Sequence, residues 1–212
     1  MMSARFRLTV RLLVLTVTGV SVACSGDRVV SPGQFASAVA SSNSSGRSSS
    51  QDDPNFLTAS PSAPPIANPV ISFWAKKGID RSIRMVYTSR PGHNDSTTFL
   101  FFRVRAQSLV SRADGTPLAN GDSVLITVTL VDPVHLKVDF QPSGLRFSQS
   151  HPATLKMSYA ETAPFSVPPG VLKIWRRESP LTPWLPLTSQ VLEDANEVTS
   201  DIGGFTGYAI AY

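Results

Sequence analysis

From Val70 to the C-terminus, apolar and polar residues alternate in short runs. A period of two residues is typical of strands that bury one face, and no stretch after Val70 has a sustained 3.6-residue apolar period. The clearest run is 154–159, where Leu155, Met157 and Tyr159 alternate with polar residues. The apolar sets of the expected strands are Ile71-Phe73-Ala75, Ile83-Met85-Tyr87, Leu100-Phe102-Val104, Val124-Ile126-Val128-Leu130, Leu136-Val138-Phe140, Leu155-Met157-Tyr159, Leu172-Ile174, Leu185-Leu187, Val198 to Ile202 and Tyr208-Ile210-Tyr212.

Turn-forming residues separate nearly all of these runs. They are Arg90-Pro91-Gly92, Ala113-Asp114-Gly115, Asn120-Gly121-Asp122, Pro142-Ser143-Gly144, Pro168-Pro169-Gly170 and Gly203-Gly204. Many short strands at regular spacing are typical of two sheets that bury one face of each strand against the other. Residues 70–212 are therefore expected to form an all-β, antiparallel β-sandwich of immunoglobulin-like type.

Residues 24–69 have the composition of a linker. Seven of the ten residues in 41–50 are Ser, and Pro54, Pro61, Pro64, Pro65 and Pro69 follow. Ser-rich chain is flexible and Pro-rich chain is stiffer, and neither has enough apolar content to offset the entropy of ordering. The sequence therefore predicts a disordered Ser/Pro-rich tether that ends at residue 69.

The first 23 residues are typical of a secretory signal peptide. Arg5, Arg7 and Arg11 form a basic start, and Leu12 to Val22 carries no charge but is about half the ~20 residues that a spanning helix needs. Small residues then precede Cys24, so this region resembles bacterial lipoprotein signals, although Ser21 stands where they prefer an aliphatic residue. The resemblance implies acylation of Cys24, for example by palmitate, and a lipid anchor in the cell envelope of a bacterium. The same resemblance implies the outer membrane, because Ser25 rather than Asp follows the cysteine. The alternative is a secreted protein released by an ordinary signal peptidase.

Charge and cysteine content narrow the classes of function. The chain has 19 Lys and Arg against 15 Asp and Glu. The three Arg of the signal leave a mature chain near neutrality, which excludes the electrostatic footprint of a nucleic-acid-binding protein. Cys24 is the one cysteine, so a disulfide within the chain is excluded.

Three motifs resemble the domain shared by zonula occludens, Unc-five and ankyrin proteins and its relatives in bacterial surface lipoproteins. They are the strand 121–128, the stretch 140–147 (FQPSGLRF) and the proline-led strand 152–159 (PATLKMSY). The segments 184–187 and 204–209 echo the end of that domain. The resemblance covers about residues 115–212 and departs from the family at the start of its domain. It implies a β-sandwich interaction module without a shared active site, and such a likeness confers no particular role.

No pattern of catalytic or metal-binding residues accompanies these strands. His93 and His151 lie in expected turns, and His135 shares a polar face with Lys137 and Asp139. No zinc spacing, nucleophile elbow or phosphate loop occurs. We therefore expect no enzyme, no metal and no cofactor, and we interpret Asp114-Gly115 and Asn120-Gly121-Asp122 as turns rather than calcium sites.

The expected function is a lipid-anchored cell-envelope β-sandwich that binds or scaffolds a protein or polysaccharide partner. A carbohydrate-binding module and an envelope hydrolase are the two alternatives.

Strand alternation places Trp74, Trp175 and Trp184 on outer faces, with Trp175 and Trp184 as neighbours. They either form a binding surface or lie under the linker and stabilise the sheet. A basic group in the first half of the domain either is solvated or faces anionic lipid or polysaccharide. Its members are Lys76, Lys77, Arg81, Arg84, Arg90, Arg103, Arg105 and Arg112.

Overall fold

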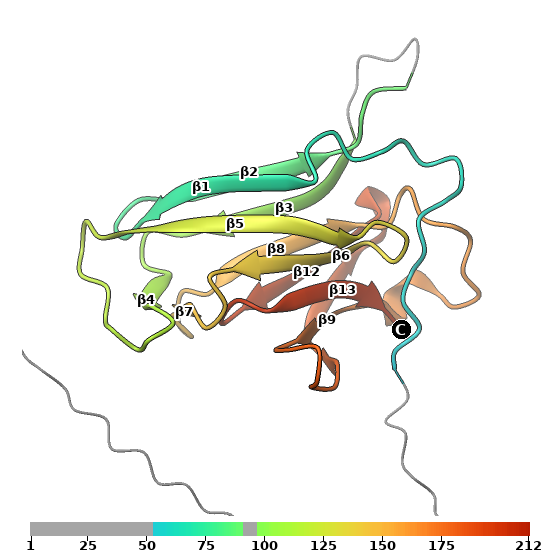
Figure 1. Cartoon of the computed structure of the whole chain (residues 1–212). Coiled ribbons are helices and arrows are strands. Elements are labelled where there is room, and N and C mark those ends of the chain that lie inside the picture. The colour runs from blue at the N-terminus through green and yellow to red at the C-terminus, as the bar shows by residue number, and fades with distance from the viewer. Residues whose placement is uncertain (1–52, 91–96) are drawn as a thin grey trace, which may run out of the picture. The chain divides into compact units, whose positions relative to one another are not determined.

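Two antiparallel sheets pack face to face with an aromatic core between them (Figure 1). The computed structural model describes residues 53–90 and 97–212. The expected signal segment 1–23, Cys24, the linker up to residue 52 and His93 lie outside the described residues. The all-β sandwich expected from the alternation is confirmed.

The first sheet has six strands, in the order β1 (Val70–Lys76), β5 (Ser123–Asp132), β6 (Lys137–Gln141), β13 (Gly207–Ala211), β9 (Lys173–Arg177) and β10 (Leu185–Pro186). The second has five, in the order β11 (Ser189–Leu192), β12 (Glu197–Ile202), β8 (Ala153–Ser158), β3 (Thr98–Val104) and β2 (Arg81–Val86). A short pair, β4 (Leu109–Ser111) with β7 (Arg146–Phe147), lies beside them. The strand β4 was not predicted, because three residues are too few to show a period.

Two single-turn 3-10 helices occur between strands, η1 (Pro169–Val171) and η2 (Glu193–Ala195). No helix within the described residues is long and apolar enough to cross a bilayer.

The alternation of apolar residues directs one face of each strand into the core, as the sequence predicted. Met157 and Leu155 on β8 are fully buried, and so is Phe102 on β3. The ring of Phe102 lies 5.0 Å from that of Phe140 on β6, and Phe140 lies 5.2 Å from Phe205. Interlocking aromatic rings of this kind add to the free energy gained by burying their area. They join the two sheets at the centre of the sandwich.

Three of the predicted turns contain a glycine with a positive φ angle, Gly115, Gly121 and Gly144. Gly121 and Gly144 have φ angles of 93° and 83°, a region that L-residues with a side chain rarely adopt. Gly144 links β6 to β7 within the stretch 140–147. A Cβ atom there would lie 3.3 Å from the Cβ of Ala113.

Residues 53–69 lie against the sandwich, although the sequence analysis placed them in the tether. The amide N of Asn55 donates to the carbonyl of Tyr212 at 3.1 Å, and that of Leu57 donates to Ile210 at 3.0 Å. Leu57 is a core residue with 2% of its surface exposed, and Ile66 forms a bridge to Tyr87. The boundary at Val70 was therefore placed too late, because one buried leucine and a row of main-chain hydrogen bonds order a Pro-rich segment that has no alternation.

Candidate binding surface

All three tryptophans belong to the outer side of the six-stranded sheet, as strand alternation predicted. Trp74 lies on β1 between the outward residues Ser72 and Lys76, whereas Phe73 points into the core. Trp175 lies on β9 and pairs with Pro186 of β10 and with Ala209 of β13. Trp184 precedes β10 by one residue, which places it across from Arg177 because Leu185 pairs with Arg176.

Trp184 is nevertheless buried, with 5% of its surface exposed. The ring of Phe56 packs edge-on against it at 5.0 Å between centroids, and the guanidinium of Arg177 lies 4.8 Å from the indole. Lys137 also lies above both rings, with its Nζ 4.1 Å from the centroid of Phe56 and 5.9 Å from that of Trp184. A cation over an aromatic face is attracted by the ring quadrupole. Phe56 therefore closes a small aromatic and cationic cluster on the outside of the sheet.

The outward residues of β13 make room for this cluster. They are Gly207, Ala209 and Ala211, and a Cβ at Gly207 would lie 3.9 Å from the indole of Trp184. Ala209 and Ala211 are fully buried. Large side chains at these positions would hold the indole away from the sheet, so the small residues permit a second apolar layer outside the first.

The predicted pair of exposed tryptophans, Trp175 and Trp184, does not form. Trp175 is half-buried, and its Nε1 is buried without a hydrogen-bond partner among the described residues. Trp184 contacts Phe56 instead of standing free. The alternative in which the tryptophans lie under the Pro-rich segment therefore describes Trp184.

Trp74 is the exposed tryptophan, with 62% of its surface open to solvent. It pairs across the strands with Leu125 of β5, which is 45% exposed, and Val70 on the same face of β1 is also exposed. Between Val70 and Trp74, the hydroxyls of Ser72 and Thr127 are 2.8 Å apart. We call Val70, Ser72, Trp74, Leu125 and Thr127 the Trp74 face. It consists of three exposed apolar side chains with a pair of hydroxyls beside the indole.

A groove of about 440 Å³ lies next to Trp184 on the same side of the sheet. Asp139, Glu178, Lys137 and Arg177 line it together with the edge of the indole. The two cations of the groove are the ones that lie over the aromatic rings. These two cations thus belong to the cluster that holds Trp184 in place, whereas Asp139 and Glu178 make no contact with its rings that resembles theirs.

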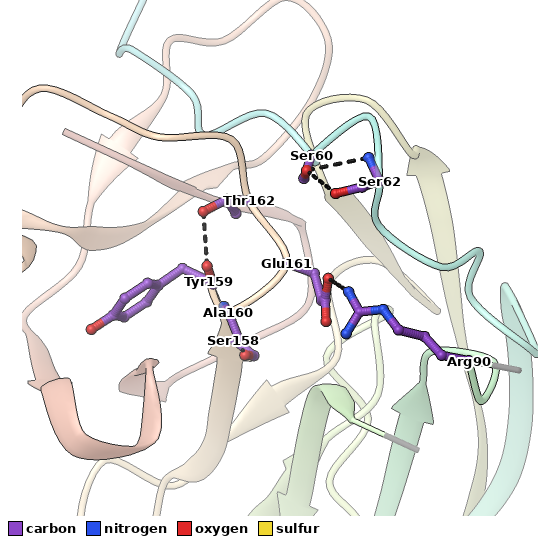
Figure 2. A network of polar contacts seen from close by, with 8 residues as sticks. All are labelled: Ser60, Ser62, Arg90, Ser158, Tyr159, Ala160, Glu161 and Thr162. Carbon is purple, nitrogen blue, oxygen red and sulfur yellow. Dashed lines mark hydrogen bonds and ion pairs between the residues drawn. The ribbon is translucent and has the colours of Figure 1, made fainter. Parts of the chain in front are cut away.

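A second buried polar group lies where the N-terminal segment meets the end of β8 (Figure 2). Glu161 is buried, and its Oε2 accepts a hydrogen bond from Nη2 of Arg90 at 2.6 Å. Its carbonyl accepts the amide of Ser60 at 2.9 Å, and Ala163 donates to the carbonyl of Thr58 at 2.8 Å. Thr162 closes the turn through its hydroxyl to the carbonyl of Tyr159. This network attaches residues 58–60 to the domain, so we assign it a structural role.

Two buried tyrosine hydroxyls near this network, those of Tyr87 and Tyr159, lack a partner among the described atoms. Burial raises the pKa of Tyr87 to about 12, and the charge of Glu161 adds to the shift. Tyr87 also lines a cavity of about 330 Å³ beneath the prolines of residues 64–69. The walls of that cavity are otherwise mostly aliphatic, so it offers no set of groups for catalysis.

The two described histidines make local contacts. His135 Nδ1 lies 2.8 Å from Oδ2 of Asp132, and Oδ1 of that carboxylate accepts the amides of Val134 and His135. No described hydroxyl bonds to the other ring nitrogen, and His151 contacts Ser150 on the surface. Within residues 53–90 and 97–212, no three His, Cys, Asp or Glu side chains gather as a metal site would require.

The chain matches no family model, no curated protein and no solved structure.

Proposed function

We propose that this chain is a lipid-anchored protein of the bacterial cell envelope whose β-sandwich binds a partner through the Trp74 face and performs no catalysis. The exposure of Trp74 beside Leu125 and Val70 carries the proposal. An exposed indole with two exposed aliphatic neighbours costs solubility unless something covers it, and tryptophan is enriched where proteins bind each other.

Anchoring and binding are separable in an experiment. Cys24→Ala should move the protein from the membrane fraction to the soluble fraction or leave the precursor uncleaved, and intact mass should show acyl chains on Cys24 of the parent protein. An unmodified Cys24 in membrane-bound protein would contradict the anchor.

Binding is tested by a photo-crosslinking residue placed at position 125 in cells, across from Trp74, which leaves the indole in place. The control places the same residue at position 181, since Leu181 is almost fully exposed but lies in a loop away from the Trp74 face. We expect discrete crosslinked species from position 125 and none from position 181. Equal patterns at the two positions, or no crosslink at position 125, would argue against a partner on this face.

A polysaccharide is the second candidate partner, because Ser72 and Thr127 place hydroxyls next to the indole of Trp74. Sugar rings stack on flat aromatic groups and exchange hydrogen bonds with neighbouring hydroxyls. Sedimentation of the purified chain with insoluble cell-wall polysaccharide, compared with Trp74→Ala, separates this candidate from a protein partner. Equal sedimentation of the two proteins would remove it.

A further inference from the structure

The strand β1 has one neighbour, β5, and ends the six-stranded sheet. Its seven residues pair with β5 in an unbroken antiparallel register, from Val70 with Thr129 to Lys76 with Ser123. No strand within the described residues covers its other edge, which runs along one side of the sandwich beside β2 (Figure 1).

The register fixes which main-chain groups point to the open edge. In antiparallel pairs, hydrogen-bonded and non-hydrogen-bonded residues alternate. Leu130 donates to the carbonyl of Pro69 and Lys77 donates to that of Asp122, both toward β5. The residues between them with the same parity, 71, 73 and 75, also bond to β5. The N–H and C=O groups of Val70, Ser72 and Trp74 therefore point away from the sheet.

Two of the three other sheet edges are shortened or covered, as is usual for edges that avoid pairing with another chain, and the third, β11, has four residues. At the far end of the same sheet, β10 has two residues, and one of them is Pro186. In the second sheet, β2 has a bulge between Met85 and Val86, and residues 65–67 pair with its end. By contrast, β1 is long and regular. Its residues with free main-chain groups, Val70, Ser72 and Trp74, are also the ones whose side chains lie on the outer face.

The surroundings of this edge are basic. Residues 70–86 contain Lys76, Lys77, Arg81 and Arg84 but one acidic residue, Asp80. Asp80 is engaged by Arg103 in an ion pair. The carboxylate of Asp122 in the adjacent turn accepts the amide of Ala119. Lys76 and Arg81 are exposed and have no ion-pair partner among the described residues.

We propose that β1 binds an extended, acidic peptide segment of another protein as an additional strand of the six-stranded sheet, with Trp74 packing on the side chains of the added strand. Strand addition supplies main-chain hydrogen bonds, and the side chains that alternate along the peptide supply specificity. The charge favours an acidic peptide over a second copy of this chain, because two β1 edges would bring like charges together. This inference rests on the proposed function, since it names the partner and the mode of binding at the Trp74 face.

Ser72→Pro tests the edge without breaking the sheet. Proline removes the outward N–H of residue 72 and puts a ring in its place, and edge strands tolerate proline where the missing N–H faces solvent. The substitution also removes the hydroxyl contact with Thr127. Thr127→Val is the matched control, because it removes the same contact and leaves the edge intact.

The probe is a random peptide library displayed on phage, selected on the immobilised full chain. We expect selected peptides to be enriched in Asp, Glu and β-branched residues and to bind more weakly as salt increases. Ser72→Pro should weaken their binding by ~10-fold or more, while Thr127→Val stays within ~2-fold. Failure to select peptides, selection without acidic enrichment, or equal binding to Ser72→Pro would overturn the proposal.

Amide hydrogen exchange in the parent protein gives a second measurement that needs no variant. The amides of Ser72 and Trp74 should exchange fast in the free protein and become protected when a selected peptide is added, while that of Phe73 is protected throughout. Unchanged exchange at Ser72 and Trp74 in the bound state would overturn strand addition.

The remaining outcomes separate this inference from the proposed function. Loss of peptide binding in Trp74→Ala with full binding in Ser72→Pro would keep the Trp74 face as the binding surface and reject strand addition. Peptide binding unaffected by both substitutions would reject both. Self-association of the parent protein that Ser72→Pro abolishes would identify a second copy as the occupant and overturn the acidic peptide.

Discussion

Trp74 and Trp184 lie at opposite edges of one sheet and on the same outer side, yet 62% of one and 5% of the other is exposed. Around Trp184, the small residues of β13 leave room for the indole against the sheet, and Phe56 and two cations cover it. Trp74 instead pairs with Leu125, and both side chains are exposed to solvent. The same residue type on the same face is thus a structural element at one edge and an open surface at the other.

The difference arises from chain far away in the sequence. Strand alternation decides the side of the sheet on which a residue lies. Whether the outer side is then buried depends on what packs over it, and here Phe56 comes from the segment that pairs with the last strand. The local pattern therefore predicts correctly which face of the sheet a residue lies on, but it does not predict whether that residue is exposed.

The largest effect should follow the loss of the covered indole. Trp184→Ala should lower the free energy of unfolding by about 3 kcal/mol, because truncating a buried aromatic residue leaves a cavity that the surrounding sheet fills poorly. Urea or thermal unfolding measures the change, with Trp175→Ala as a half-buried comparison. A loss below ~1 kcal/mol would mean that the buried indole and its contacts with Phe56 and the cations contribute little to the stability of the fold.

The contrast also shows what the sequence was able to predict. The inward residues Met157, Phe102 and Phe140 are buried as the alternation predicted, because each lies in a strand long enough to show its period. Leu185 was expected inside but is 42% exposed, while Trp184 is buried on the outer side. The segment that covers Trp184 was taken for tether, because Phe56 and Leu57 stand among Ser and Pro without a repeating pattern. Only the long-range pairing with β13 reveals their role.

The anchoring leucine of that segment should give the next effect. Leu57→Ala should cost about 2–3 kcal/mol, since Leu57 is a core residue although it precedes the first strand. The matched control is Leu181→Ala, in which the same atoms are removed from an exposed position.

Limited proteolysis provides an independent readout. The resistant fragment of the parent protein should begin near Asp53, and in Leu57→Ala it should begin nearer Val70. A resistant fragment that already begins near Val70 in the parent protein would contradict the packing of this segment.

High pH should lower the stability of the protein through Tyr208 on β13, the strand against which the Trp184 cluster packs. Burial raises the pKa of Tyr208 on β13 to about 12, whereas an unfolded tyrosine titrates near 10. Between these values the unfolded chain has released the proton and the folded chain has kept it, so the free energy of unfolding falls as pH rises from about 10 to about 12. Tyr208→Phe should make this fall less steep, as measured by urea unfolding at several pH values. An unchanged slope in the variant would exclude Tyr208 as a source.

A double-mutant cycle sharpens the account of the cover itself. Phe56→Ala and Trp184→Ala should show a coupling energy of about 0.5–1.5 kcal/mol, because the two rings pack edge to face. The corresponding cycle between Trp74 and Phe56 is the control, and its coupling should be near zero. Equal coupling in the two cycles would indicate a general effect of Phe56 on the fold instead of a direct contact.

The smallest effect on stability should come from Trp74. Trp74→Ala should change the free energy of unfolding by no more than ~0.5 kcal/mol, since most of the indole is in water in the folded protein and little burial is lost. Acrylamide quenching gives the optical counterpart: the readily quenched part of the tryptophan fluorescence should disappear in Trp74→Phe, whereas Phe56→Ala should add a new quenchable part from Trp184. If Trp74→Ala instead cost as much as Trp184→Ala, the indole would be held by contacts of its own and the two edges would be alike. With stability unchanged, any loss of partner binding in Trp74→Ala is assigned to the exposed surface, because the fold beneath it is intact.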